Sequence, residues 1–471
     1  MHADQERQLS PVLILAIISF AVFMASLDSS IVNISLPSIA TFFDVDISII
    51  SWVVLSYALM LAGLLLVFGK LGDVHGFRRI FIIGFALFTA GSLLCGLSGS
   101  INQLIAFRAL QGIGASALDA IAPAMLVMYL PAEKRGWALG ILATVVSFGI
   151  AAGPILGGFI TEYLSWHWIF FINVPVGILA ILLAYRYFPA DSAVQRQGSF
   201  DTTGSALVLL ALVTLLFALN QGLDFGWTSP MILGSFALSV ILFALFVIHE
   251  RRCSAPLFDP ALFASRNYLA GNIAGTLLMF AYAGTEFLLP FYFELVQGWS
   301  TEVAGLLLAV PAIALMVAGP VAGTLSDRIG SRMLTTGAAL FAGFTLYLFS
   351  LFGPATSPAF IIATLVLFGI AIGIFFPPNM SLILGSGGSE GGGVASGVMM
   401  TLRNTGAVFG VALFGTIVVQ VVSGLMIRSQ VIDASPAILS AGFPAAFAGG
   451  IVLCLLAAVV SYATSTGPSG S

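Results

Sequence analysis

The chain has 471 residues, of which 59% are hydrophobic and only 8% charged, and its mean hydropathy is +1.09. Soluble domains carry roughly 25% charged residues, so this composition excludes a water-soluble globular protein. The net charge of -4 says little about partners, and no basic tail or basic segment interleaved with aromatic residues indicates nucleic acid as a partner. Because the apolar runs are continuous rather than alternating, we expect an all-helical integral membrane protein that has the lipid bilayer as its partner.

Fourteen apolar runs have about the length that a helix needs to cross a membrane. They lie near 12–34, 49–69, 79–98, 103–129, 137–161, 167–187, 203–220, 230–249, 267–291, 302–325, 332–352, 358–384, 394–423 and 442–464. The first run is as long as a full span, so we interpret it as a transmembrane helix rather than a cleavable signal peptide. Cys95 and Cys454 lie within runs and Cys253 between two runs, so no disulfide framework is expected.

The distribution of basic residues predicts the orientation, because cytoplasmic loops hold an excess of Lys and Arg. With fourteen spans and both termini in the cytoplasm, thirteen of the sixteen Lys and Arg residues fall on the cytoplasmic side. Arg428 is then the only one on the outer side, and the other two lie inside spans. An odd number of spans would destroy this segregation.

Two of the predicted cytoplasmic turns share one pattern. Residues 69–79 and residues 323–332 both read Gly, two residues, a small residue, Asp, two residues, Gly, one residue, and Arg. The glycines permit a tight reversal, the Asp can accept from helix N-terminal amides, and the Arg anchors the turn in the cytoplasm. The turns are eight spans apart, which predicts a duplicated six-helix unit with two inserted helices.

This doubled turn resembles the loop signature of the major facilitator superfamily, although Val74 and Phe77 stand where that family usually has basic residues. Further motifs in the same order are similar to those of its fourteen-helix drug:proton antiporter branch. They are Leu27 to Pro37, Arg108 to Gly114, Gly149 to Gly158, Trp166 to Gly177, and Phe200 to Gly204.

The resemblance implies two six-helix bundles, residues 1–187 and 267–471, around a central cavity, with two helices of residues 188–266 inserted between them. It implies a secondary active exporter without enzymatic activity, cofactor or metal, which exchanges protons for small hydrophobic, cationic, drug-like substrates by alternating access. Such a protein would confer antibiotic resistance from the inner membrane of a prokaryotic cell. A monomer is expected, and an additional accessory protein is left open.

Two other functions fit the sequence less well, and a third remains as an alternative. Nucleotide-driven pumping is disfavoured because no phosphate-binding glycine-lysine loop is present. An ion-translocating respiratory subunit would need lysines within its spans, but Lys70 and Lys134 both lie in loops. An exporter or flippase of lipids, fatty acids or cell metabolites on the same fold remains as the alternative.

Five charged residues lie well inside apolar runs, away from the ends of the runs, and each costs at least about 2.5 kcal/mol at bilayer depth. They are Asp28, Arg108, Asp119, Glu286 and Arg403. All except Arg403 lie on helices that the resemblance places around the cavity. We interpret Asp28 and Arg108 as a proton switch, because burial favours a neutral carboxyl whereas a nearby guanidinium favours the ionised form. The alternative is a static ion pair that sets helix packing.

Asp119 and Glu286 lie outside the shared motifs and are expected to bind protons or attract lipophilic cations. The alternatives are a bond from Glu286 to Tyr282 or water, and a partnership of Asp119 with Arg403 or a backbone amide. Arg403 itself is expected to act as a latch between helices. The side chains expected along the substrate path, several of which could stack on cations, are Trp52, Tyr57, Gln111, Phe280, Tyr282, Phe287, Phe375 and Phe376.

Gly149, Gly153 and Gly157 recur at every fourth position, which is typical of a helix face that packs closely against a neighbour. Pro154 removes one backbone hydrogen bond and bends that helix. The resemblance implies that this segment seals one face of an exporter. The residues of the two turns expected to act in gating are Gly69, Gly72, Asp73, Arg78, Asp327 and Arg328.

Overall fold

The computed structural model describes residues 11–129, 132–188, 201–222, 225–253, 264–386, 392–425 and 434–464. These residues form helices and connecting turns, with no β-strand among them. They include 13 helices that are long and apolar enough to cross a membrane, and the apolar helix Thr203–Leu219 is shorter. The prediction of an all-helical membrane protein is confirmed.

The helices follow one another in three groups. The N-terminal group consists of α1 (Pro11–Phe43), α2 (Ile47–His75), α3 (Phe77–Gly96), α4 (Ile101–Tyr129), α5 (Ala132–Tyr163), α6 (Trp168–Phe171) and α7 (Asn173–Tyr187). The inserted pair consists of α8 (Thr202–Gln221) and α9 (Pro230–Glu250). The C-terminal group consists of α10 (Arg266–Phe291), its π-helical extension η3 (Tyr292–Val296), α11 (Thr301–Ile329), α12 (Ser331–Ser350), α13 (Pro358–Ser386), α14 (Gly392–Leu425), α15 (Pro436–Ser440) and α16 (Gly442–Tyr462).

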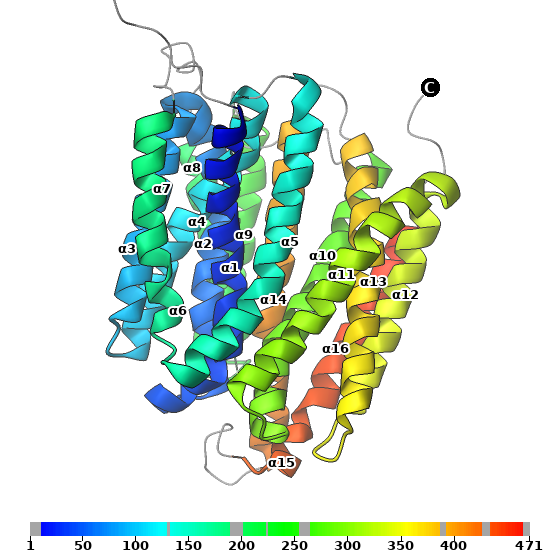
Figure 1. Cartoon of the computed structure of the whole chain (residues 1–471). Helices are drawn as coiled ribbons and strands as arrows, with labels where there is room; N and C mark the ends of the chain where they lie inside the picture. The colour runs from blue at the N-terminus through cyan, green and yellow to red at the C-terminus, as the bar shows by residue number, and fades with distance from the viewer. Residues whose placement is uncertain are drawn as a thin grey trace, which may run out of the picture.

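Helix α1 begins and α16 ends on the same side of the molecule, which we call the terminal side, and the opposite side is the distal side (Figure 1). Within the N-terminal group α1 packs on α5, and α4 packs on α2 and α3. Within the C-terminal group α10 packs on α14, and α11 packs on α13. The two groups meet through α5 with α11 and through α2 with α14.

The two related turns have the same backbone conformation. Gly76 joins α2 to α3 with φ 97°, and Gly330 joins α11 to α12 with φ 85°. The N–H of Gly76 donates to the carbonyl of Gly72, and that of Gly330 donates to the carbonyl of Ser326, both at 2.9 Å. Because a positive φ is costly for residues with a Cβ, glycine ends one helix here and lets the next begin at once. The repeated sequence pattern thus corresponds to a repeated structure.

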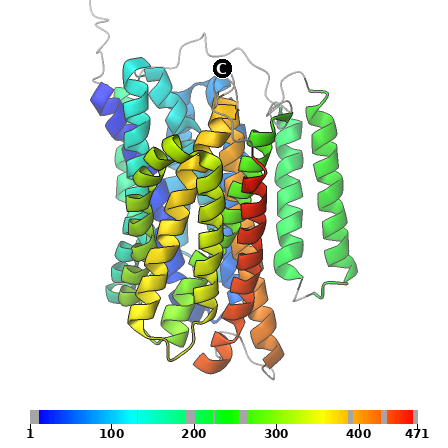
Figure 2. The ribbon, with the colours of Figure 1, turned by 90° about the vertical axis from the view of Figure 1, so that its right-hand side faces the viewer.

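The inserted helices α8 and α9 pack on each other and stand at one edge of the molecule (Figure 2). Helix α8 contacts both of the larger groups. A Cβ added to Gly63 of α2 would lie 2.5 Å from Leu209, and Thr416 of α14 donates a hydrogen bond to the carbonyl of Leu219 at 3.5 Å. Helix α8 therefore covers the line along which α2 meets α14. The division into units at residues 187 and 266 stays a prediction.

Candidate functional site

Asp28 of α1 and Arg108 of α4 form an ion pair inside the N-terminal group. Arg108 Nη1 lies 2.8 Å from Asp28 Oδ2, and the two side chains are 1% and 0% exposed. Arg108 Nε donates to the carbonyl of Val53 at 3.1 Å, and its guanidinium carbon lies 4.1 Å from the ring centre of Tyr57. The structure therefore brings these two predicted residues together.

Three further side chains complete a hydrogen-bond network around the pair. Gln111 Nε2 donates to Asp28 Oδ1 at 2.8 Å and to Ser92 Oγ at 2.7 Å, and Asn173 Nδ2 donates to Asp28 Oδ1 at 2.6 Å. Arg108 Nη1 also donates to Gln111 Oε1 at 2.6 Å. The Asp28 carboxylate thus accepts from three side chains, which compensates the loss of hydration that makes buried ion pairs costly.

Asn173 and Ser92 were not predicted as site residues. Asn173 stands within the 166–177 motif. Because an amide inside an apolar helix must find a buried hydrogen-bond partner, the sequence did indicate that Asn173 contacts another polar residue. Ser92 gave no such signal, because a serine in a transmembrane helix commonly bonds to its own backbone.

The pair and its neighbours are enclosed by α1, α2, α3, α4 and α7 and do not line the space between the two large groups. Tyr57 is 3% exposed, and Gln111 and Phe287 are fully buried. All three were expected along the substrate path. In this conformation a substrate cannot touch them, because their side chains have almost no accessible surface.

Asp119 lies on α4, about three turns from Arg108 along the helix. Its side chain is partly exposed. The ion pairs of the described residues are Asp28 with Arg108 and Asp201 with His249, so Asp119 forms none, with Arg403 or any other described residue. A carboxyl without a cationic partner at this depth is available to a proton or to a cationic ligand.

A second cluster of predicted residues forms in the C-terminal group from Tyr282 and Glu286 of α10, Phe376 of α13 and Arg403 of α14. The guanidinium carbon of Arg403 lies 4.2 Å from the ring centre of Phe376. Tyr282 lies within electrostatic reach of both Glu286 and Arg403. Glu286 Oε1 is buried without a hydrogen-bond partner, so the predicted alternative of a bond to Tyr282 is not formed by this atom. We call these four residues the α10–α14 cluster.

The glycines of α5 pack against two different neighbours. Gly149, Gly153 and Gly157 face α1, and a Cβ at Gly153 would clash with Ser30. Gly158 instead faces α11, where a Cβ would lie 2.6 Å from the carbonyl of Thr301. The first three therefore hold the N-terminal group together, whereas Gly158 lies at the contact between the groups.

Helices α5 and α11 also make polar contacts with each other on the distal side. The N–H of Thr301 donates to Glu162 Oε2 at 3.2 Å, and the hydroxyl of Tyr163 donates to Glu302 Oε2 at 2.6 Å. A Cβ at Gly305 of α11 would clash with the carbonyl of Pro154. The two helices approach each other here and diverge toward the terminal side (Figure 1).

The turn residues make contacts within their own helix group. Arg78 Nη2 donates to the carbonyl of Tyr185 at 2.6 Å, which ties α3 to α7. A Cβ at Gly72 would lie 2.8 Å from Phe77, whereas Gly69 has open space and Arg328 is exposed. The side chains of Asp73 and Asp327 lie outside the described residues. The expected gating role of these turns stays a prediction.

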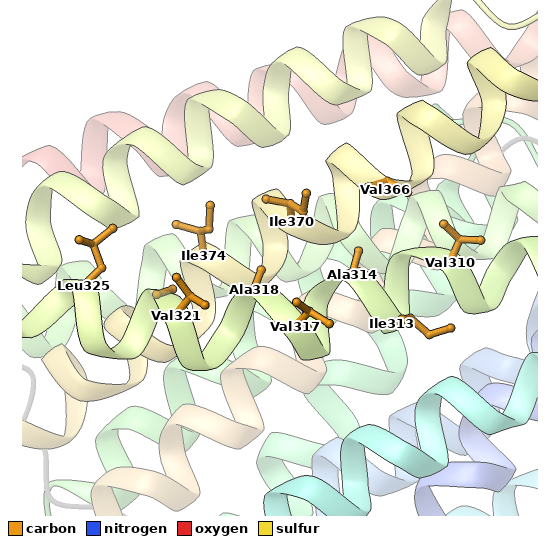
Figure 3. A pocket seen from close by; sticks show the side chains of 11 residues that line it. Val310, Ile313, Ala314, Val317, Ala318, Val321, Leu325, Val366, Ile370 and Ile374 are labelled. Atoms are coloured by element: carbon orange, nitrogen blue, oxygen red, sulfur yellow. The ribbon is translucent and has the colours of Figure 1, made fainter.

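An apolar groove of about 590 Å³ runs along α11 and α13 (Figure 3). It extends along α11 from Val310 to Leu325, which lies toward the terminal side, and α13 contributes Val366, Ile370 and Ile374. Because its walls are almost entirely aliphatic, the groove can accommodate hydrophobic molecules such as lipid chains.

The sequence is similar to those of several curated transporters. It is 36% identical over 409 residues to the riboflavin transporter RibZ of Clostridioides difficile (strain 630), covering 87% of this chain and 88% of that protein. It is 33% identical over 398 residues to the multidrug resistance protein Stp of Mycobacterium tuberculosis (strain CDC 1551 / Oshkosh), covering 84% of this chain and 73% of that protein.

The fold is similar to that of a bacterial homologue of the human lysosomal transporter Spinster, solved in an inward-facing and unoccupied conformation. The TM-score is 0.68 at 15% sequence identity, over 97% of both chains. The family model of the major facilitator superfamily matches residues 18–411, which is more than half of the chain. The chain therefore belongs to the major facilitator superfamily, a family of multi-pass membrane transporters.

Proposed function

We propose that this transporter is a proton-coupled antiporter of the fourteen-helix branch, which exports hydrophobic, cationic compounds by alternating access. Residues 1–187 and 267–471 act as its two moving bundles. The terminal side faces the cytoplasm of a prokaryotic cell, because this orientation places thirteen of the sixteen Lys and Arg residues there. With α5 and α11 in contact on the distal side, the described conformation is then closed toward the outside.

The buried pair of Asp28 and Arg108 carries the proposal. Its 2.8 Å contact joins two charges that have at most 1% exposure within membrane-spanning helices, where ionisable groups mark proton or substrate pathways by default. Protonation of Asp28 would release Arg108 from its counter-charge. A movement of α1 relative to α4 could therefore be coupled to proton binding, since the pair is stable only when both charges are present.

Asp119 and the α10–α14 cluster support a cationic, hydrophobic cargo. Each contributes a carboxyl without an ion-pair partner among the described residues. The groove along α11 and α13 offers an apolar surface. Stp, a relative by sequence, is named as a multidrug resistance protein.

Transport of riboflavin is the second candidate function. It is favoured by the 36% identity to RibZ over 87% of this chain. Riboflavin is an uncharged, flat heteroaromatic metabolite and would stack on aromatic rings without needing the free carboxyls. The two candidates therefore differ in their dependence on Asp119 and Glu286.

The test uses purified protein in proteoliposomes with an imposed pH gradient. A fluorescent lipophilic cation, riboflavin and a fatty acid are offered separately, and accumulation is measured with and without a protonophore. The pH gradient supplies about 1.4 kcal/mol per unit and proton. We expect gradient-driven accumulation of the cation, whereas accumulation of any substrate that persists after the gradient is collapsed would contradict proton coupling.

Substitution of Asp119 by Asn is expected to weaken transport of the cation about tenfold, because a lost charge interaction in a partly buried site costs roughly 1 to 2 kcal/mol. Transport of a neutral substrate should change little, and so should the amount of folded protein. Asp119→Glu retains the charge and serves as the matched control. Equal losses for cationic and neutral substrates would show that Asp119 does not select the cargo.

A further inference from the structure

Three side chains of types that bind metal ions lie together at the terminal end of the inserted pair, apart from the buried pair of Asp28 and Arg108. Asp201 precedes α8, His249 lies in the last turn of α9, and Cys253 follows four residues later. One ligand atom from each lies within 4.8 Å of the other two. His249 Nε2 and Asp201 Oδ1 are in direct contact at 2.8 Å.

Asp201 caps the N-terminus of α8, and this role uses only one oxygen of its carboxylate. Oδ1 accepts from the backbone N–H of Gly204 at 2.9 Å and contacts His249. Oδ2 is buried and has no hydrogen-bond partner in the structure. The side chain is only 4% exposed, so bulk water does not supply one either. A buried carboxylate oxygen without a partner is unfavourable, so this atom is explained better by a ligand than by capping alone.

The thiol of Cys253 lies within hydrogen-bonding reach of Asp201 and forms no disulfide.

We propose that Asp201, His249 and Cys253 bind a zinc ion through Oδ2, the imidazole and the thiolate. Zn²⁺ prefers such mixed nitrogen, sulfur and oxygen ligands and takes four of them. A water can supply the fourth ligand. The His249 side chain is 32% exposed, which gives the ion a path from the aqueous phase.

Binding would join the start of α8 to the end of α9. The thiol of Cys253 loses its proton to solvent when the metal binds, so zinc affinity should increase with pH. In the proposed orientation the cluster faces the reducing cytoplasm, where a thiol remains available as a ligand.

The experiment titrates tag-free, full-length protein in detergent with Zn²⁺ in competition with a chromophoric chelator. We expect one Zn²⁺ per chain, and a loss of affinity of at least about tenfold in Cys253→Ser and in His249→Gln, as for other losses at metal sites. With Co²⁺ as the probe, the wild type should show a thiolate-to-metal charge-transfer band that Cys253→Ser lacks. Cys454→Ser and His167→Gln are the matched controls and should bind like the wild type.

The proposal is overturned if the wild type binds no Zn²⁺, or if both variants retain its affinity and the cobalt band. Size-exclusion profiles of the variants establish that they are folded. Asp201→Asn is avoided as the main variant, because it would also change the cap of α8. None of these readouts depends on transport, so failure of the proposed antiport would leave the result intact.

Discussion

Substitution of Asp28 by Asn is expected to abolish proton-driven transport and to lower the stability of the protein. The neutral side chain leaves Arg108 buried without its counter-charge, and breaking a buried ion pair in this way costs about 3 to 5 kcal/mol. The amide group of Asn would also face the donors of Gln111 and Asn173, which now bond to Asp28 Oδ1. Transport is measured in proteoliposomes with a pH gradient, and stability by thermal unfolding in detergent.

A double variant separates the proton role from the structural role. Asp28→Asn combined with Arg108→Gln removes both charges, so no uncompensated charge remains in the N-terminal group. We expect this variant to recover most of the lost stability and none of the gradient-driven transport. If it recovered transport as well, the pair would be a structural element, as the alternative interpretation of the sequence holds.

Substitution of Gly305 by Leu is expected to reduce transport strongly while the protein remains folded. Any Cβ at this position clashes with the carbonyl of Pro154, so α5 and α11 could not keep their close approach on the distal side. Overpacking of this kind costs about 1 to 3 kcal/mol. Each 1.4 kcal/mol against one conformation changes its population about tenfold.

The readout for Gly305→Leu is the labelling of single cysteines introduced into α5 and α11 on the distal side, which should increase together with the loss of transport. Gly337→Leu is the matched control, because Gly337 also lies in the C-terminal group and has open space around its Cβ position. Gly153→Leu should behave differently from both and lose stability, since its clash with Ser30 lies within the N-terminal group. Normal transport by Gly305→Leu would show that the distal contact is not needed in the cycle.

The spans were predictable from the sequence because each is long and apolar, but their ends were not. Helix α1 was expected to end near residue 34 and continues to Phe43, through Pro37. Polar residues near the expected end are satisfied within the bundle: Ser35 bonds to Thr161 at 2.7 Å, so it does not require water. Hydropathy marks the apolar part of a helix and cannot show where polar side chains find partners.

The pairing of Asp28 with Arg108 could also be predicted, because so few charges lie within the spans. The enclosure of the pair could not, since the partners of Asn173 and Ser92 are set by how α7 and α3 pack against α1 and α4. The same limit applies to Tyr57, whose ring lies on Arg108 rather than along a substrate path. Residue type and spacing indicate the face of one helix, whereas the neighbour opposite that face is set by packing of the whole bundle.

The position of α8 has a consequence for the entry of cargo. This helix touches α2 at Leu209 and α14 at Leu219, so it lies along one edge of the contact between the large groups. Among the residues that the structure describes, no helix covers the opposite edge in this way, between α5 and α11. Cargo from the membrane should therefore enter between α5 and α11, at the terminal side where these two helices diverge (Figure 1).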